Sequence, residues 1–294
     1  MKEEASFLKK SSKKLLFDWL GAHRRRTRAL RILIDKVFLL LFVDKKKILP
    51  VPAFILFLAT PAHAFTRVVS LNLCTDDLLI ALAPGKIVAL SPLSRDPALA
   101  VRIGPYPTVH PDAEAVLHTD PDLILAAAYG ATATVAILQA RGLPVWRTQL
   151  PQDFPAIAAE TLQLGALLGV SGRARALVAE MNRTLAAIPR RERGSAIIFE
   201  ARGYVDQPGT LGDAVLRAAG YRNQAGRSRL DLESLVEAPP GLLVTVRRPA
   251  FPSLATDLLD HPALARLRRR SIDPTLLICA GPWTAQAASA LAAP

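Results

Sequence analysis

Hydrophobic and polar positions along the chain repeat one pattern twice, in residues 112–127 and 231–246. The first copy reads DAEAVLHTDPDLILAA and the second reads DLESLVEAPPGLLVTV, so Glu114 aligns with Glu233 without gaps. Each copy has an acidic start, a stretch with helical spacing, a proline turn and an apolar run short enough for a buried strand. A helix–turn–strand unit that occurs twice predicts two lobes built alike.

Between the two copies, residues 153–188 keep an apolar spacing that is typical of a helix, and the run Gly169–Gly172 should kink or break it. Elsewhere, short apolar runs alternate with helical segments, which favours parallel sheets covered on both faces. We therefore predict an α/β fold of two Rossmann-like lobes joined by a long bridging helix. The predicted parts are an N-terminal extension with signal peptide at 1–64, an N-terminal lobe at 65–152, the bridging helix at 153–189 and a C-terminal lobe at 190–294.

Local signals predict where several elements begin and end. Thr75 is the expected N-cap of the first helix of the N-terminal lobe, because its hydroxyl can accept a hydrogen bond from the first turn. Thr275–Cys279 is the expected last strand of the chain. The arginines of 266–270 are expected at an exposed helix end, where cations suit the helix dipole.

The net charge of +12 is concentrated at the N-terminus. Residues 1–64 contain 14 Lys and Arg against 5 Asp and Glu, a net of +9, and the rest of the chain carries a net of only +3. The rest of the chain also has no dense basic stripe with interleaved aromatic residues, so nucleic acid is not an expected partner.

The segment before Phe65 has the three parts of a secretory signal. Lys45–Lys47 are a charged start, residues 48–60 are an apolar stretch, and Ala62–Ala64 contain an A-x-A cleavage site. The apolar stretch is shorter than the roughly 20 residues that cross a bilayer. We expect cleavage after Ala64 and export to the periplasm. An uncleaved membrane anchor is the alternative.

Residues 1–42 are an unusual addition in front of such a signal. Translation that starts at Val43 instead would produce an ordinary signal peptide, because Val43 directly precedes the charged start. N-terminal sequencing that finds peptides from 1–42 would contradict this hypothesis.

The cysteines and histidines do not predict a catalytic or metal site. Cys74 and Cys279 are the only two cysteines, and the exported compartment permits a disulfide, but the sequence does not decide whether they pair. A thiol near a ligand and two small buried hydrophobic residues are the alternatives. His110, His118 and His261 lack metal-ligand spacing, and neither a nucleophile elbow nor a phosphate loop is present.

Four motifs occur in order along the exported chain: RVVSLNLCTD at 67–76, EAVLxxxPDLILA at 114–126, TLGDAVLxxAG at 210–220 and CxGPW at 279–283. With the bridging helix, they make residues 65–294 resemble the substrate-binding proteins of ABC importers, in the class that serves cobalamin, haem and ferric siderophores. The resemblance implies a monomer without a cofactor of its own, which holds an iron or cobalt chelate between its lobes.

The same resemblance implies an ABC permease in the inner membrane as partner. One glutamate on each lobe docks onto arginines of the permease in this class, and Glu114 and Glu233 occupy the matching positions. Charge-assisted pairs of this kind fix orientation. The alternative is that each glutamate only favours the N-terminus of its helix.

Ligand contacts are expected beyond the carboxyl ends of parallel strands. Aromatic residues suit a flat conjugated ligand, and arginine suits negative charge. The candidates are Asn72, Cys74, Arg95, Tyr129, Arg202, Tyr204 and Trp283. A packing role is the alternative for each aromatic residue. Two other functions remain open, a protein of the same scaffold that binds a bare metal ion and a secreted two-lobed α/β enzyme.

Overall fold

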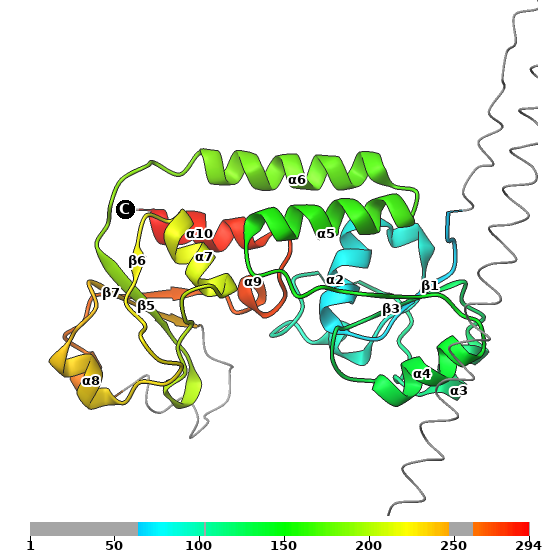
Figure 1. Cartoon of the computed structure of the whole chain (residues 1–294), viewed down its shortest axis with the longest axis horizontal. Helices are drawn as coiled ribbons and strands as arrows, with labels where there is room; N and C mark the ends of the chain where they lie inside the picture. The colour runs from blue at the N-terminus through cyan, green and yellow to red at the C-terminus, as the bar shows by residue number, and fades with distance from the viewer. Residues whose placement is uncertain (1–63, 103, 247–260, 294) are drawn as a thin grey trace, which may run out of the picture. The chain divides into compact units, whose positions relative to one another are not determined.

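The structure is a computed structural model that describes residues 64–102, 104–246 and 261–293 (Figure 1). The predicted signal peptide and the hypothesis of a start at Val43 lie outside these residues. Within the described part, we find no helix with the length and apolar character needed to cross a membrane.

The first half of the described chain forms a parallel sheet of four strands in the order β2-β1-β3-β4. Three α-helices connect these strands in sequence, so each crossover returns the chain to the same end of the sheet. The elements are β1 Val68–Ser70, α2 Leu73–Leu82, β2 Ile87–Ala89, α3 Ala113–His118, β3 Leu123–Ala126, α4 Thr132–Ala140 and β4 Val145–Arg147.

The second half forms a second parallel sheet, in the order β6-β5-β7-β8. Its elements are β5 Ser195–Phe199, α7 Leu211–Ala218, β6 Arg222–Asn223, α8 Leu232–Glu237, β7 Leu242–Val246, β8 Arg269–Ile272, α9 Thr275–Ile278 and α10 Thr284–Ala292. Each sheet places its second strand at one edge, then its first, third and fourth strands. Both sheets therefore have the same strand order. This confirms the predicted fold class and the prediction that the two halves are built alike.

The internal repeat corresponds to the same structural unit in both sheets. Asp112 caps α3 by accepting a hydrogen bond from the backbone N–H of Ala115 at 2.8 Å. Asp231 caps α8 in the same way, with the N–H of Ser234 at 2.9 Å. Each helix is followed by an inner strand of its sheet, β3 or β7. The acidic start of each copy is therefore a helix N-cap, as this residue type favours.

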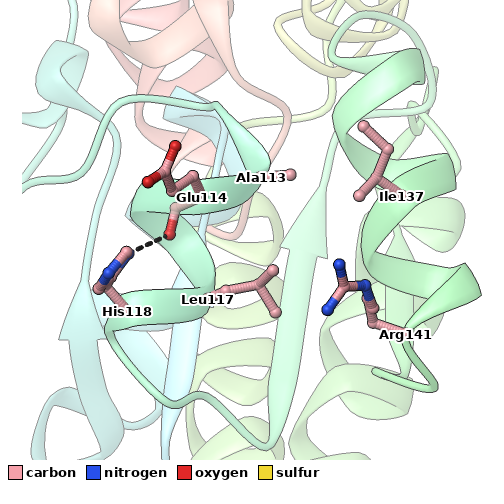
Figure 2. Close-up of a pocket in the computed structure, with 6 residues that line it drawn as sticks. All are labelled: Ala113, Glu114, Leu117, His118, Ile137 and Arg141. Carbon is pink, nitrogen blue, oxygen red and sulfur yellow. Dashed lines mark hydrogen bonds between the residues drawn. The ribbon is translucent and has the colours of Figure 1, made fainter.

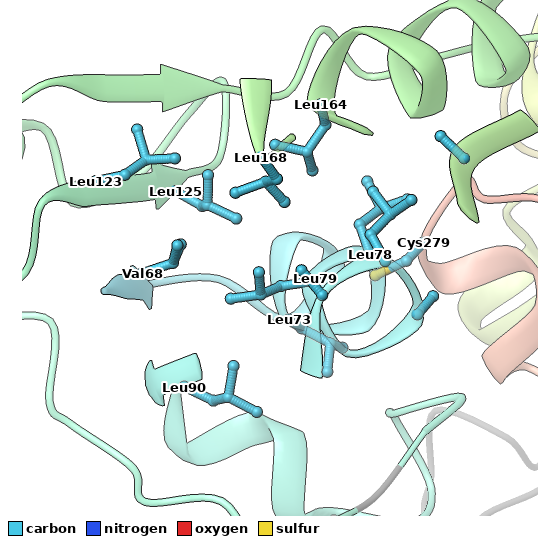
Figure 3. Close-up of a cluster of buried hydrophobic side chains, with 14 of the residues drawn as sticks. Val68, Leu73, Leu78, Leu79, Leu90, Leu123, Leu125, Leu164, Leu168 and Cys279 are labelled. Carbon is cyan, nitrogen blue, oxygen red and sulfur yellow. The ribbon is translucent and has the colours of Figure 1, made fainter. Parts of the chain in front are cut away.

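Alternate residues of β3 pack on opposite faces of the first sheet. Leu123 and Leu125 of β3 belong to the cluster in Figure 3, together with Leu79 of α2 and residues of the helical segment that follows β4. Ile124 points to the other face, where α3 and α4 contribute Val116 and Leu138. The two-residue period of the strand therefore places apolar side chains in both helical layers.

The predicted bridging helix is two helices, α5 Phe154–Leu167 and α6 Ser171–Ala186, which lie side by side in Figure 1. The chain reverses at Gly169, whose φ of +68° is a conformation that glycine adopts without strain. A Cβ atom on Gly169 would also lie 2.5 Å from the Cβ atom of Ala64. The predicted interruption at Gly169–Gly172 is confirmed, and it is a reversal of direction rather than a kink.

Three local predictions were wrong. The N-cap of α2 is Asn72, not Thr75, because the Asn72 side chain accepts the N–H of Cys74. The segment Thr275–Ile278 is helix α9, and Asp273 supports its start by accepting hydrogen bonds from the N–H and hydroxyl of Thr275. The last strand is β8, which includes two of the arginines predicted at a helix end. An edge strand needs few apolar residues, so its sequence gives little signal.

Candidate ligand-binding site

Tyr129 lies in the loop that leaves the carboxyl end of β3. Its side chain is free, because 80% of the residue is exposed and its hydroxyl makes no hydrogen bond within the described residues. The backbone below it is fixed: Arg147, at the end of β4, donates from Nη1 to the carbonyl oxygens of Ala127 and Ala128, both at 3.1 Å. An anchored loop with a free aromatic ring is suited to contact a ligand.

Arg202 and Tyr204 lie together on a tight turn after β5. The guanidinium of Arg229 stacks over the Tyr204 ring at 5.8 Å, and its Nε donates to the carbonyl of Arg202 at 2.9 Å. Gly203 between them has a φ of +80°, and a Cβ atom there would lie 2.5 Å from the carbonyl oxygen of Leu230. Tyr204 is 52% exposed, so this turn presents a second aromatic ring to solvent.

A hollow of about 250 Å³, which was not predicted from the sequence, lies beyond β5 and β7. Its carboxylates are Glu200, the residue directly after β5, and Asp206, which accepts a hydrogen bond from the Thr210 hydroxyl at 3.2 Å. Burial raises the pKa of Glu200, and Asp206 raises it further. Burial also raises the pKa of Asp206. The rule for strand carboxyl ends would have found Glu200, because it follows the run SAIIF.

Two buried carboxylates hold the loop that follows β2. Asp76 of α2 accepts hydrogen bonds from the backbone N–H and the hydroxyl of Ser91, and burial raises its pKa to about 7. Asp77 accepts the N–H groups of Val101 and Arg102 at 3.3 and 3.1 Å. Both ends of the segment 91–102 are thereby tied to α2, and the segment carries the candidate Arg95.

Arg95 and Asn72 are both engaged within the protein. Arg95 is exposed, and its Nη2 donates to the carbonyl of Tyr106 at 3.4 Å. The side-chain oxygen of Asn72 accepts the N–H of Cys74 at 2.9 Å as the helix cap. A ligand could still be contacted by the amide N–H₂ group of Asn72 or by the second lone pair of its side-chain oxygen.

The structure decides the question that the two cysteines left open. Cys74 of α2 and Cys279, between α9 and α10, form a disulfide. Cys74 therefore offers a ligand no thiol. Cys279 is buried in the same cluster as Val68 of β1 (Figure 3), so a segment close to the C-terminus packs on the core of the first sheet.

Trp283 is not accessible as a ligand contact, which corrects the sequence prediction. Only 3% of the residue is exposed, and its indole N–H donates to the carbonyl of Cys279 at 3.0 Å. The guanidinium of Arg102 covers its ring at 5.1 Å. The CxGPW motif turns tightly at Gly281, which brings the ring into the core beside the disulfide.

The structure groups the remaining candidates by sheet. Arg202 and Tyr204 follow a strand of the second sheet, and Asn72, Arg95 and Tyr129 follow strands of the first. Among the described residues, no hydrogen bond, ion pair or ring contact joins one group to the other. In the same part of the chain, no group of three or more His, Cys, Asp and Glu residues could hold a metal ion.

Glu114 and Glu233 occupy equivalent exposed positions in the first turns of α3 and α8. Neither carboxylate makes a hydrogen bond or an ion pair within the described part of the chain. Their helices are already capped by Asp112 and Asp231. Neither glutamate is therefore needed as a cap, and both carboxylates are free for a partner.

The chain is similar to known binding proteins in sequence and in structure. It matches the family described as periplasmic binding protein over residues 68–268. A cobalamin-binding protein of Halobacterium salinarum strain R1 is 28% identical over 172 residues, which are 54% of this chain and 45% of that protein. The chain thus spans less than half the length of this relative.

Two solved structures of haem-binding proteins share the fold. The periplasmic haem-binding protein from Roseiflexus sp. RS-1, in its apo form, has a TM-score of 0.62 and 25% identity, over 77% of this chain and 96% of that one. The periplasmic haem-binding protein from Pseudomonas aeruginosa has a TM-score of 0.60 and 27% identity, over 78% and 91% of the two chains.

Proposed function

Because this chain belongs to the periplasmic binding protein family, we propose that it captures a metal chelate and delivers it to an ABC permease. The proposed ligands are cobalamin, haem or a ferric siderophore. Relatives named as cobalamin-binding and haem-binding proteins support this class of ligand. The family and these relatives are binding proteins rather than enzymes. An exported protein that works as a monomer in the periplasm fits this function.

The observation that carries the proposed ligand site is the pair of exposed tyrosines. Tyr129 follows the inner strand β3 of one sheet, and Tyr204 follows the first strand β5 of the other. Ligands of open parallel sheets bind beyond the carboxyl ends of the strands. Flat rings suit the conjugated surface of a corrin or a porphyrin. Arg202 beside Tyr204 adds a positive charge that suits a propionate or a phosphate.

Titration with three probes tests the ligand class. We would follow binding of cyanocobalamin, haemin and ferrioxamine B to the purified protein by calorimetry and thermal unfolding. One probe should bind saturably and raise the melting temperature. The double variant Tyr129→Ala, Tyr204→Ala should weaken that binding at least about tenfold, because stacking rings are frequent binding hot spots. Its own melting temperature should change little, since both rings are exposed and the contact of Tyr204 with Arg229 contributes only about 0.5–1 kcal/mol.

Other outcomes of the titration would overturn the proposal. Stabilisation by a free divalent metal alone would favour a protein that binds a bare ion. Turnover of a probe would favour an enzyme. Equal binding by the parent protein and the tyrosine variant would move the ligand away from these two loops.

Delivery to a permease is supported by the free carboxylates of Glu114 and Glu233. Two equivalent units of one chain can meet two equivalent subunits of a partner, and arginines of that partner would neutralise both carboxylates. The double variant Glu114→Arg, Glu233→Arg should abolish uptake by cells that lack the parent protein, while the purified variant binds its ligand normally. The matched control is Glu180→Arg, Glu192→Arg, which makes the same charge change at other exposed positions. Equal uptake by both variants would contradict docking through Glu114 and Glu233.

A further inference from the structure

A depression of about 480 Å³ lies on the surface between helices α3 and α4 (Figure 2). We call it the α3–α4 groove. Leu117 of α3 and Arg141, directly after α4, point toward one another across it in Figure 2. Its lining residues are Ala113, Glu114, Leu117, His118, Ile137 and Arg141.

The floor of the α3–α4 groove is apolar, and its Ile137 is not part of the core, whereas Leu117 and Ala113 also pack against the core. Ile137 is 49% exposed, although Val135 and Leu138 of the same helix are fully buried. Helix α4 therefore has a core-facing side and a separate apolar side that faces the groove beside Leu117. A large aliphatic side chain at the wall of a depression gains free energy when a partner covers it.

The two flanks of the groove carry opposite charges that the described structure leaves unpaired. Glu114 and His118 line the groove from the α3 side, where the His118 ring is held by the carbonyl of Glu114 at 2.8 Å. Arg141 lies on the α4 side. Within the described residues, its guanidinium makes no hydrogen bond or ion pair. A carboxylate, an apolar strip and a guanidinium thus follow one another across the surface.

We propose that the α3–α4 groove extends the permease-docking surface of the first lobe. The segment of the permease that fits it presents an arginine to Glu114, an apolar side chain to Leu117 and Ile137, and a carboxylate or a carbonyl to Arg141. Ion pairs at such a rim fix orientation, and the covered apolar side chain supplies affinity. This inference rests on the proposed function, because the permease is its partner.

The internal repeat favours the permease over a second copy of this chain as the occupant. Glu114 has an equivalent in Glu233 on α8, so the surface around it is one of two related positions. A partner with two equivalent subunits would meet both positions.

Photo-crosslinking tests the occupant directly. The full chain would carry benzoylphenylalanine at position 137 and be expressed in its source organism, and adducts would be identified by mass spectrometry. Position 162 on α5 is the control, since Leu162 is also partly exposed, at 38%, and lies outside the groove. The expected result is an adduct with the transmembrane subunit of an ABC permease from position 137 only. An adduct with a second copy of this chain, or equal labelling from both positions, would overturn the inference.

Two aspartate variants separate this inference from the proposed function. Ile137→Asp should lower uptake at least about tenfold, the loss expected for an interface anchor, with ligand affinity of the purified protein unchanged. Leu162→Asp should leave uptake unchanged. If cells with the Ile137→Asp variant show normal uptake while cells with the Glu114→Arg, Glu233→Arg variant do not, the groove inference fails. Docking through the two glutamates then stands. If no probe binds the parent protein, the proposed function itself fails.

Discussion

The Cys74–Cys279 disulfide should contribute a large part of the stability of this protein. It joins α2, beside the first sheet, to the segment between α9 and α10. The double variant Cys74→Ala, Cys279→Ala removes it and leaves no free thiol. Alanine also avoids a buried polar atom at position 279, where only 1% of the residue is exposed.

The size of the effect follows from the sequence separation of the two cysteines, which is 205. A crosslink lowers the entropy of the unfolded chain by about 2.1 + 1.5R ln n cal/mol/K, where n is the length of the closed loop. For this loop the entropy is about 18 cal/mol/K, which is about 5 kcal/mol at 25 °C. Whole domains have unfolding free energies of about 5–15 kcal/mol. The variant should therefore lose a third or more of its stability.

Urea unfolding measures the loss. Trp283 is a suitable reporter, because it packs beside the disulfide and donates its indole N–H to Cys279. Circular dichroism provides a second probe of the same transition. The parent protein in a reducing agent is the control, since reduction opens the same loop without changing the sequence. A loss below about 1 kcal/mol in the variant, with the disulfide of the parent intact, would refute the chain-entropy reasoning.

Two further changes probe the buried aspartate and a constrained turn. Burial raises the pKa of Asp76 from 3.8 to about 7, so the folded state keeps a proton that the unfolded state has released. The contribution of Asp76 to stability is thus present below about pH 4 and is lost as the pH rises through 7. Asp76→Asn stays neutral and should flatten the fall in unfolding free energy between about pH 4 and 7; the same slope in both proteins would contradict this. Gly220→Ala should lose about 2 kcal/mol or more, because φ is +88° and the new Cβ would lie 2.3 Å from the Arg191 carbonyl oxygen. Gly226→Ala, where a Cβ meets nothing within 4 Å, is its control in the same thermal unfolding assay, and equal losses would show that the turn is not constrained.

Local patterns in the sequence predicted the architecture well. The repeated acidic start became the N-caps Asp112 and Asp231, and the apolar runs after the prolines became the inner strands β3 and β7. These features depend on neighbours a few residues apart, so the sequence shows them directly. The exposed positions of Glu114 and Glu233 follow from the same helices.

The candidate site was predicted less completely, because burial depends on contacts between distant segments. Tyr129 and Tyr204 are exposed beyond strand ends, as the rule for parallel sheets expects, and their ligand contacts stay a prediction. Trp283 also follows the last elements of its sheet, yet it is buried. Arg102 covers its ring, and the carbonyl of Cys279 accepts its indole N–H. No pattern around position 283 shows that Arg102 would reach it.

The sequence by itself determined two α/β units built alike, since strand and helix periods, caps and turns are encoded within short windows. Only the tertiary structure decided that Cys74 pairs with Cys279 and that Glu200 and Asp206 share a hollow. Only the tertiary structure also decided that β8, not the more apolar segment Thr275–Cys279, completes the second sheet. The physical reason is the same in each case. A disulfide, a shared hollow and an edge strand depend on which distant segments the folded chain brings together, and spacing along the sequence does not specify those contacts.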